Sequence, residues 1–136
     1  SGSEEHQLGE EYFDPEIYDE KLGRVNTVPL MQANLQLFDE SKWVVPILTN
    51  ANTIASSWAT ELGLLFIDGS HTEKSAMNDY DNWCSKLHPQ GALVIHDIYE
   101  KPEDGGQAPY LIFQKALAEG FQLHERVDTI VCLTRA

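Results

Sequence analysis

The fold is decided by the stretch Leu64-Leu65-Phe66-Ile67-Asp68-Gly69-Ser70-His71, in which an apolar run ends abruptly in polar residues. Uninterrupted apolar runs of this kind are typical of parallel strands that are covered on both faces. A second run, Ala92 to Ile95, ends in the same way at His96-Asp97. Between the two runs, apolar residues recur at intervals of three and four, which predicts a helix with Thr72 as its N-cap. Strand, helix and strand in this order indicate parallel strands in an α/β domain.

The segments on either side extend this alternation of helical and strand patterns. The further predicted elements are a helix over 27–39, a strand over 43–48, a brief helix capped by Asn52 or Thr53, a turn at 88–91, a helix from Pro109 to Ala118, and strands over 121–126 and 129–134. The last two strands are so close in the chain that they should pair antiparallel. The sequence therefore predicts a three-layer α/β fold whose sheet is mostly parallel and ends in an antiparallel strand pair.

The composition is that of one globular domain. The chain has 136 residues, of which 42% are hydrophobic and 23% charged, so wholesale disorder is excluded. No apolar run approaches the roughly 20 residues that span a bilayer, and no signal peptide is apparent, so we expect a cytoplasmic protein without membrane contact. Nine Lys and Arg residues against 22 acidic residues give a net charge of −13. This balance excludes nucleic acid as a partner, because binding phosphate requires a basic face.

The acidic residues are concentrated at the N-terminus. Residues 1–20 contain eight of them and no Lys or Arg, which predicts a solvated acidic arm. Within this arm, residues 1–3 (Ser-Gly-Ser) resemble the remnant of a cleaved expression tag. We therefore expect the folded domain to span residues 21–136.

Two of the predicted strands end in polar side chains that could form a site. Asp68 and His71 follow the first apolar run, and His96 and Asp97 follow the second. Ligands of parallel sheets bind beyond the carboxyl ends of the strands, so these side chains should converge on one edge. Carboxylates from both strands, together with imidazole nitrogens, could hold a divalent cation such as Mg²⁺. The structural alternatives are that Asp68 caps the next helix, that Asp97 closes an Asx-turn, and that His71 is a surface residue.

The two strand-end motifs carry a family resemblance. Residues 64–71 with the helix containing Asp79-Tyr80-Asp81-Asn82-Trp83, and the later stretch Leu87-His88-Pro89-Gln90-Gly91-Ala92-Leu93-Val94-Ile95-His96-Asp97, resemble the second half of class I S-adenosylmethionine-dependent methyltransferases. The most similar branch has a strand-end IDGxH motif and a later PGG-hydrophobic-HD motif, as in cephalosporin-hydroxylase-like proteins and small-molecule O-methyltransferases. The resemblance covers residues 12–136. It implies a Rossmann-like sheet, S-adenosylmethionine as cofactor and a small-molecule substrate.

The resemblance also implies roles for individual residues. In metal-dependent members the acids at the positions of Asp68 and Asp97 bind Mg²⁺, and His96 stands where some members have a glutamate ligand. A histidine three residues after the first acid is the general base in some relatives, which points to His71, and imidazole suits removing a proton from a hydroxyl group. Asn50 and Ala51 follow the strand whose end contacts the cofactor adenine in this family. Asp68 is also implied as a cofactor contact.

The resemblance is incomplete at the N-terminal side. Residues 1–26 contain no counterpart of the family's first strand and glycine-rich cofactor loop, so we expect a truncated form of the fold with an uncovered strand edge. Covering that edge with a second copy would make the protein a homodimer. Three functions remain open: a methyltransferase acting on a small-molecule hydroxyl, a non-catalytic self-associating remnant of the fold, and a cofactor-independent metal hydrolase.

Overall fold

The computed structural model describes residues 7–10, 13–38, 42–69 and 72–135. The chain divides into two compact units, Ser1–Leu48 and Thr49–Ala136. The predicted division between an arm of residues 1–20 and a domain of residues 21–136 stays a prediction. None of the helices in the described part of the chain is long and apolar enough to span a membrane.

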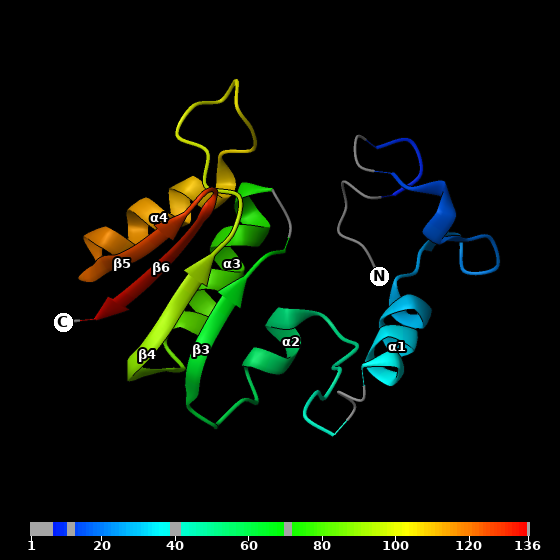
Figure 1. Ribbon diagram of the computed structural model, residues 1–136, viewed down its shortest axis with the longest axis horizontal. Helices are drawn as coiled ribbons and strands as arrows, with labels where there is room; N and C mark the ends of the chain where they lie inside the picture. The colour runs from blue at the N-terminus through cyan, green and yellow to red at the C-terminus, as the bar shows by residue number, and fades with distance from the viewer. Residues whose placement is uncertain (1–6, 11–12, 39–41, 70–71, 136) are drawn as a thin grey trace. The chain divides into compact units, whose positions relative to one another are not determined.

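The described residues of the first unit form a 3-10 helix, a short hairpin and an α-helix (Figure 1). Its elements are the 3-10 helix η2 (Pro15–Ile17), strands β1 (Tyr18–Asp19) and β2 (Arg24–Val25), which pair antiparallel, and helix α1 (Val28–Leu37). The Asp19 side chain stabilises the hairpin turn by accepting hydrogen bonds from the backbone N–H groups of Lys21 and Leu22. These bonds stabilise the carboxylate, so the pKa of Asp19 lies below its ordinary value, with the Leu22 N–H as the largest cause.

Helix α1 confirms the helix that the sequence predicts over residues 27–39, but the strand predicted over 43–48 is wrong. Thr27 is the N-cap and a proline occupies the first turn, where its missing N–H does no harm. Residues 44–48 have no regular secondary structure, and the flanking Trp43 is 76% exposed and Val45 is 82% exposed. A β-branched run becomes a strand only where a partner accepts its backbone hydrogen bonds, and no described strand pairs with this segment.

The second unit is an α/β domain (Figure 1). Its elements are α2 (Ala51–Ala55), β3 (Leu62–Ile67), α3 (Glu73–Cys84), β4 (Leu87–Ile95), α4 (Ala108–Ala118), β5 (Phe121–Val127) and β6 (Ile130–Arg135). The four strands form one sheet in the order β3-β4-β6-β5. The α/β class is therefore confirmed, and the sheet is consistent with a truncated Rossmann-like fold.

The sheet is mixed rather than mostly parallel. Strands β3 and β4 are parallel, whereas β4 with β6 and β5 with β6 are antiparallel. The C-terminal antiparallel pair is thus confirmed. The parallel part is smaller than the sequence predicts, because residues 43–48 do not form a strand of this sheet.

Strand β4 begins earlier than predicted, and the turn placed at residues 88–91 lies inside it. Leu87 pairs with Leu62 and Ala92 pairs with Leu64, so four residues of β4 oppose Gly63 alone. A Cβ atom at Gly91 would stand 3.0 Å from the backbone carbonyl oxygens of Gly63 and His88. The turn-forming composition therefore makes a bulge in the strand, and glycine is required where the two backbones approach.

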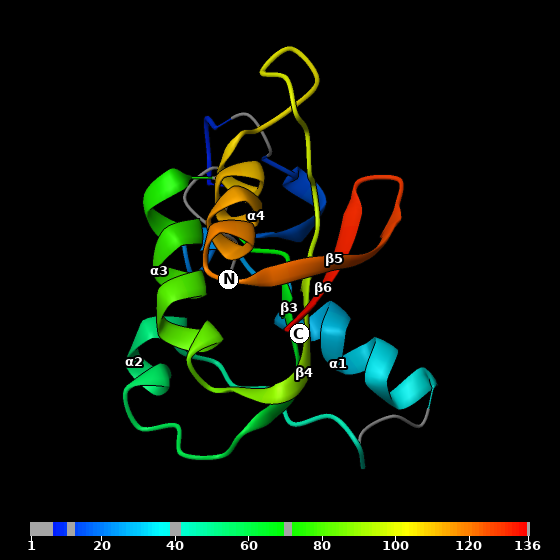
Figure 2. The ribbon, with the colours of Figure 1, turned by 90° about the vertical axis from the view of Figure 1, so that its left-hand side faces the viewer.

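The core of this unit lies between the sheet and helices α3 and α4, which lie together on one side of it (Figures 1 and 2). The side chains at its centre are fully buried: Leu93, Ile95, Ile112, Ala116, Val131 and Leu133. On the opposite face of the edge strand β3, Leu64 is 57% exposed and Phe66 is 49% exposed. Within this unit the strand is therefore covered on one face only, because α3 and α4 pack on the face that carries Ile67, whereas the sequence predicts cover on both faces.

Candidate functional site

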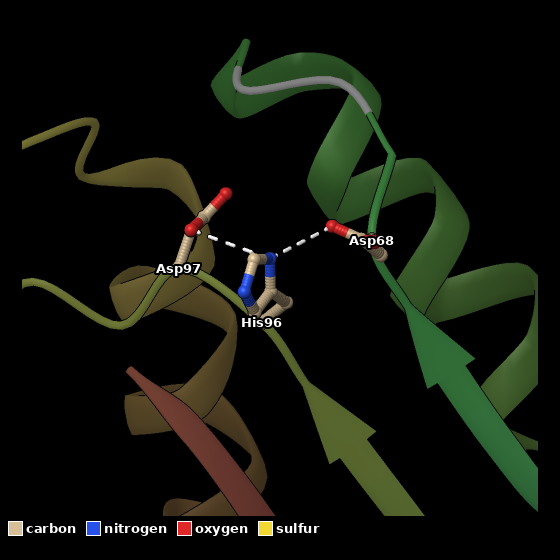
Figure 3. Close-up of side chains that lie close together, drawn as sticks. All are labelled: Asp68, His96 and Asp97. Carbon is tan, nitrogen blue, oxygen red and sulfur yellow. Dashed lines mark hydrogen bonds and ion pairs between the residues drawn. The ribbon is translucent and has the colours of Figure 1, made fainter. Parts of the chain in front are cut away.

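Three of the predicted site residues meet at the carboxyl ends of the two parallel strands. Ile67 ends β3 and pairs with Ile95, which ends β4, so Asp68 and His96 occupy neighbouring positions just beyond the sheet (Figure 3). The backbone N–H of His96 donates to the carbonyl oxygen of Ile67 over 3.1 Å. This bond continues the parallel ladder past the strand end and keeps the two residues side by side.

The imidazole of His96 lies between two carboxylates. Its Nδ1 atom is 3.0 Å from Oδ1 of Asp68 and 3.3 Å from Oδ1 of Asp97 (Figure 3). One ligand atom from each of the three residues can be chosen so that all lie within 4.8 Å of one another. The cluster therefore brings a nitrogen and oxygens from two strand ends within the span of a single cation.

The backbone at Asp97 turns sharply to make this arrangement. Asp97 has a φ of 59°, in the left-handed region that few residues other than glycine, asparagine and aspartate adopt readily. The next residue, Ile98, is 1% exposed, and its N–H donates to the carbonyl of Thr129 over 2.9 Å. Asp97, with its left-handed backbone, is thus followed directly by the buried Ile98, which holds the Asp97 carboxylate at the sheet edge.

The cluster is accessible, and the space beside it is small. The side chains of Asp68 and His96 are 48% and 33% exposed, whereas that of Asp97 is 20% exposed. A cavity of about 10 Å³ adjoins them, lined also by Gly69, Ala76, Pro109 and Ile112. This volume matches one water molecule or one ion, so a larger ligand would have to lie over the edge rather than inside it.

The donor set fits a divalent cation. Carboxylate oxygens are the ligands that Mg²⁺ and Mn²⁺ prefer, and an imidazole nitrogen is a good ligand for Mn²⁺ and Zn²⁺. The same arrangement also supports proton transfer. When Nδ1 of His96 donates its proton to Asp68, Nε2 carries the lone pair and can accept a proton from a hydroxyl group.

The other predicted site residues do not join this cluster in the part of the chain that the structure describes. His71 lies outside the described residues. Asn50 is the N-cap of α2, where its Oδ1 accepts the N–H of Asn52, and Ala51 is the first residue of the helix. Asn52 in turn accepts a hydrogen bond from Asn82, near the last turn of α3.

Helix α3 starts beside the carboxyl end of β3 and runs back along the strand, so α2 lies at the other end of the sheet from Asp68 (Figure 1). The structure thus brings Asp68, His96 and Asp97 together but not Asn50 and Ala51. The assignment of Asn50, Ala51 and Asp68 to the cofactor stays a prediction.

Asp79, which no sequence motif singles out as a site residue, is a half-buried acid of α3 beside Gly69. Its Oδ2 atom lies 3.3 Å from the position that a Cβ atom at Gly69 would occupy. Burial raises the pKa of the Asp79 carboxyl above its ordinary value. The position of Asp79 in the sequence indicates its burial. It is one turn of helix after Ser75 and Ala76, on the side of α3 that carries the buried Ala76 and Tyr80.

Replacing Asp79 by asparagine is expected to stabilise the protein at neutral pH. The folded state holds the Asp79 proton more tightly than the unfolded state does, so unfolding free energy falls as pH rises from the unfolded pKa through the folded pKa. Asparagine removes this penalty. Thermal melts of Asp79→Asn should show a higher Tm at pH 7, and the gain should vanish below the ordinary aspartate pKa of about 3.9.

The matched control for this prediction is Asp81→Asn on the same helix. Asp81 is exposed and lies 3.5 Å from Nζ of Lys115, so its neutralisation should leave Tm unchanged or lower it slightly. A lower Tm for Asp79→Asn at pH 7 would contradict the prediction and would mean that the charged carboxylate is needed beside Gly69.

The region of the chain that carries this cluster matches a known protein family. Residues 12–98, which are more than half of the chain, match a family described as a methyltransferase domain. The matched region contains both strand ends and all three residues of the cluster.

Proposed function

The chain belongs to the methyltransferase domain family, and on that premise we propose that it transfers a methyl group from S-adenosylmethionine to a hydroxyl group of a small molecule with the help of a divalent cation. The observation that carries the proposal is the cluster of Asp68, His96 and Asp97 at the carboxyl ends of β3 and β4. In parallel sheets this edge is where ligands bind.

The reaction requires a bond exchange at the methyl carbon and the removal of one proton. The hydroxyl oxygen forms a bond to the methyl carbon, the bond between that carbon and the cofactor sulfur breaks, and the hydroxyl proton is taken by a base. A divalent cation held by Asp68, His96 and Asp97 would lower the pKa of a hydroxyl group bound to it. We propose His71, three residues after Asp68, as the base that accepts the proton.

The chain's own residues orient these groups. The bond from the His96 N–H to the Ile67 carbonyl keeps the two strand ends in register. Asp97 is held at the edge by the buried Ile98 that follows it. The net charge of −13 favours a cationic methyl donor and a divalent cation over anionic ligands, because opposite charge raises the local concentration of a ligand.

The proposal is tested in two steps with the full chain. Calorimetric titration with S-adenosylmethionine should show binding, and tritium from the labelled methyl group should pass to hydroxylated small molecules in the presence of Mg²⁺. Chelation of the cation and the substitution Asp97→Asn should each reduce this transfer, whereas Asp104→Asn, in the exposed loop after the site, should not.

Each negative result has a defined meaning. An absence of binding heat at about millimolar cofactor would overturn the proposal in favour of a non-catalytic form of the fold, since useful cofactor sites bind more tightly. Tight cation binding combined with the absence of cofactor binding would point instead to metal-dependent hydrolysis.

A further inference from the structure

Strand β3 has an open edge. The sheet order places β4 on one side of β3, and no strand in the described ranges pairs with its other side. Natural edge strands are protected by charged residues, proline or strong bulges. Residues 64–67 have none of these, since they are Leu-Leu-Phe-Ile, and the nearest charges are Glu61 and Asp68 at either end.

The other edge of the sheet is different. Strand β5 carries Glu125 and Arg126, and its residues 122–127 are all exposed. Another strand that paired with β5 would have to desolvate these charged side chains, so β5 is protected in the usual way. Of the two edge strands of this sheet, β3 is therefore the one that can pair with another strand.

The backbone groups that β3 offers can be identified from its pairing with β4. The carbonyl of Ile67 accepts the N–H of His96, so Ile67 directs its N–H and C=O toward β4. Successive residues of a strand direct these groups to alternate sides. Leu65 therefore also faces β4, and Leu64 and Phe66 present their N–H and C=O groups on the open side.

We propose that β3 pairs antiparallel with β3 of a second copy of this chain, about a two-fold axis at Leu65. In this register Leu64 exchanges two hydrogen bonds with Phe66 of the partner subunit, and Phe66 exchanges two with Leu64 of the partner subunit. The N–H and C=O groups that residues 64 and 66 direct to the open side thereby all form hydrogen bonds. The two sheets become one continuous sheet of twice the width.

The side chains are compatible with this pairing. The exposed Leu64 stands directly opposite Phe66 of the partner subunit on the open face, and an aromatic residue opposite an aliphatic one stabilises antiparallel strands. Asp68 stands opposite Leu62 of the partner subunit, so no like charges face each other although the chain carries a net charge of −13. The uncharged segment is self-complementary, which is why the occupant is a second copy. The pairing does not depend on methyl transfer.

The first test is sedimentation velocity over a dilution series from about 100 μM to about 1 μM. The native chain should form a dimer, and Phe66→Lys should raise the dissociation constant at least about tenfold by placing a charge at the pairing edge. Val127→Lys is the matched control: it makes the same change of charge at a residue that is 63% exposed at the far edge of the sheet. Far-UV circular dichroism is the check that both variants are folded.

A native chain that remains monomeric throughout this range would overturn the proposal and would mean that the edge is covered within one chain. A dimer that survives Phe66→Lys, or that Val127→Lys dissociates equally, would place the interface elsewhere.

The second test examines the register by cross-linking in a Cys132→Ser background. Residues at the two-fold axis form a non-hydrogen-bonded pair with Cα atoms about 4.5 Å apart, within the range that a disulfide spans. Leu65→Cys should therefore give a covalent dimer on oxidation. In Leu64→Cys the two thiols lie on a diagonal of about 7–8 Å and should cross-link far less. Equal cross-linking of both variants, or of neither, would contradict the proposed register.

Discussion

Replacing Asp68 by asparagine is expected to weaken Mn²⁺ binding by at least about a hundredfold, because mutation of outer groups that only support metal ligands already costs about 10–100-fold. The substitution removes one of the two carboxylates within 4.8 Å of the His96 nitrogen and keeps the shape of the side chain. An amide oxygen carries no net charge and attracts a cation less strongly than a carboxylate does. Calorimetric titration of the full chain with Mn²⁺ alone measures the change.

The control for this prediction is Asp104→Asn, which removes the same charge from the exposed loop beyond the cluster. It should leave Mn²⁺ affinity within about a factor of two, because an exposed charge at a distance is largely screened. Equal weakening by both variants would show that the chain attracts cations through its net charge of −13 rather than through a defined site. The cluster would then be a surface group without a metal function.

Replacing Ile95 by alanine is expected to lower the free energy of unfolding by about 2–5 kcal/mol. Ile95 is fully buried, at the end of β4 and between β3 and β6, and it belongs to the cluster that packs under α3 and α4. Truncation leaves a cavity that close-packed neighbours fill only in part. Since domains of this size are stable by about 5–15 kcal/mol, the loss is a large fraction of the total. Urea unfolding with an unchanged m-value measures it.

The neighbouring substitution Val94→Ala separates burial from strand propensity. Val94 is also β-branched and lies on the same strand, but its side chain is only half-buried on the opposite face. Its truncation should cost about 1 kcal/mol, which is the usual effect outside the core. If both substitutions lowered the free energy of unfolding equally, the face of the sheet that α3 and α4 cover would not be the centre of the core.

Several elements were predictable because their information is local. The helix of residues 73–84 was visible as apolar residues at intervals of three and four behind Thr72, and the structure begins it at Glu73. The C-terminal strands were visible as β-branched segments around a short turn, where Asp128 adopts a φ of 54°. Periodicity and turn chemistry involve only neighbouring residues, so the sequence alone carries them.

The errors arose where the outcome depended on a distant partner. Residues 43–48 have strand-forming composition but no described strand pairs with them. Residues 88–91 have turn-forming composition but join β4 as a bulge, because Leu87 pairs with Leu62 across the helix that connects the strands. Propensity is a weak preference, and long-range hydrogen bonds outweigh it in either direction.

The site shows the same division. The sequence alone indicates that Asp68, His96 and Asp97 follow apolar strands, since an apolar run that ends in polar residues is a local pattern. The place of the His96 imidazole between the two carboxylates follows from the packed chain, because it depends on the pairing of Ile67 with Ile95 and on the left-handed backbone of Asp97. The same holds for the half-buried position of Asp79 beside Gly69 and for the exposure of Leu64 and Phe66 on one face of β3. Burial and register are properties of the packed chain, so no local pattern contains them.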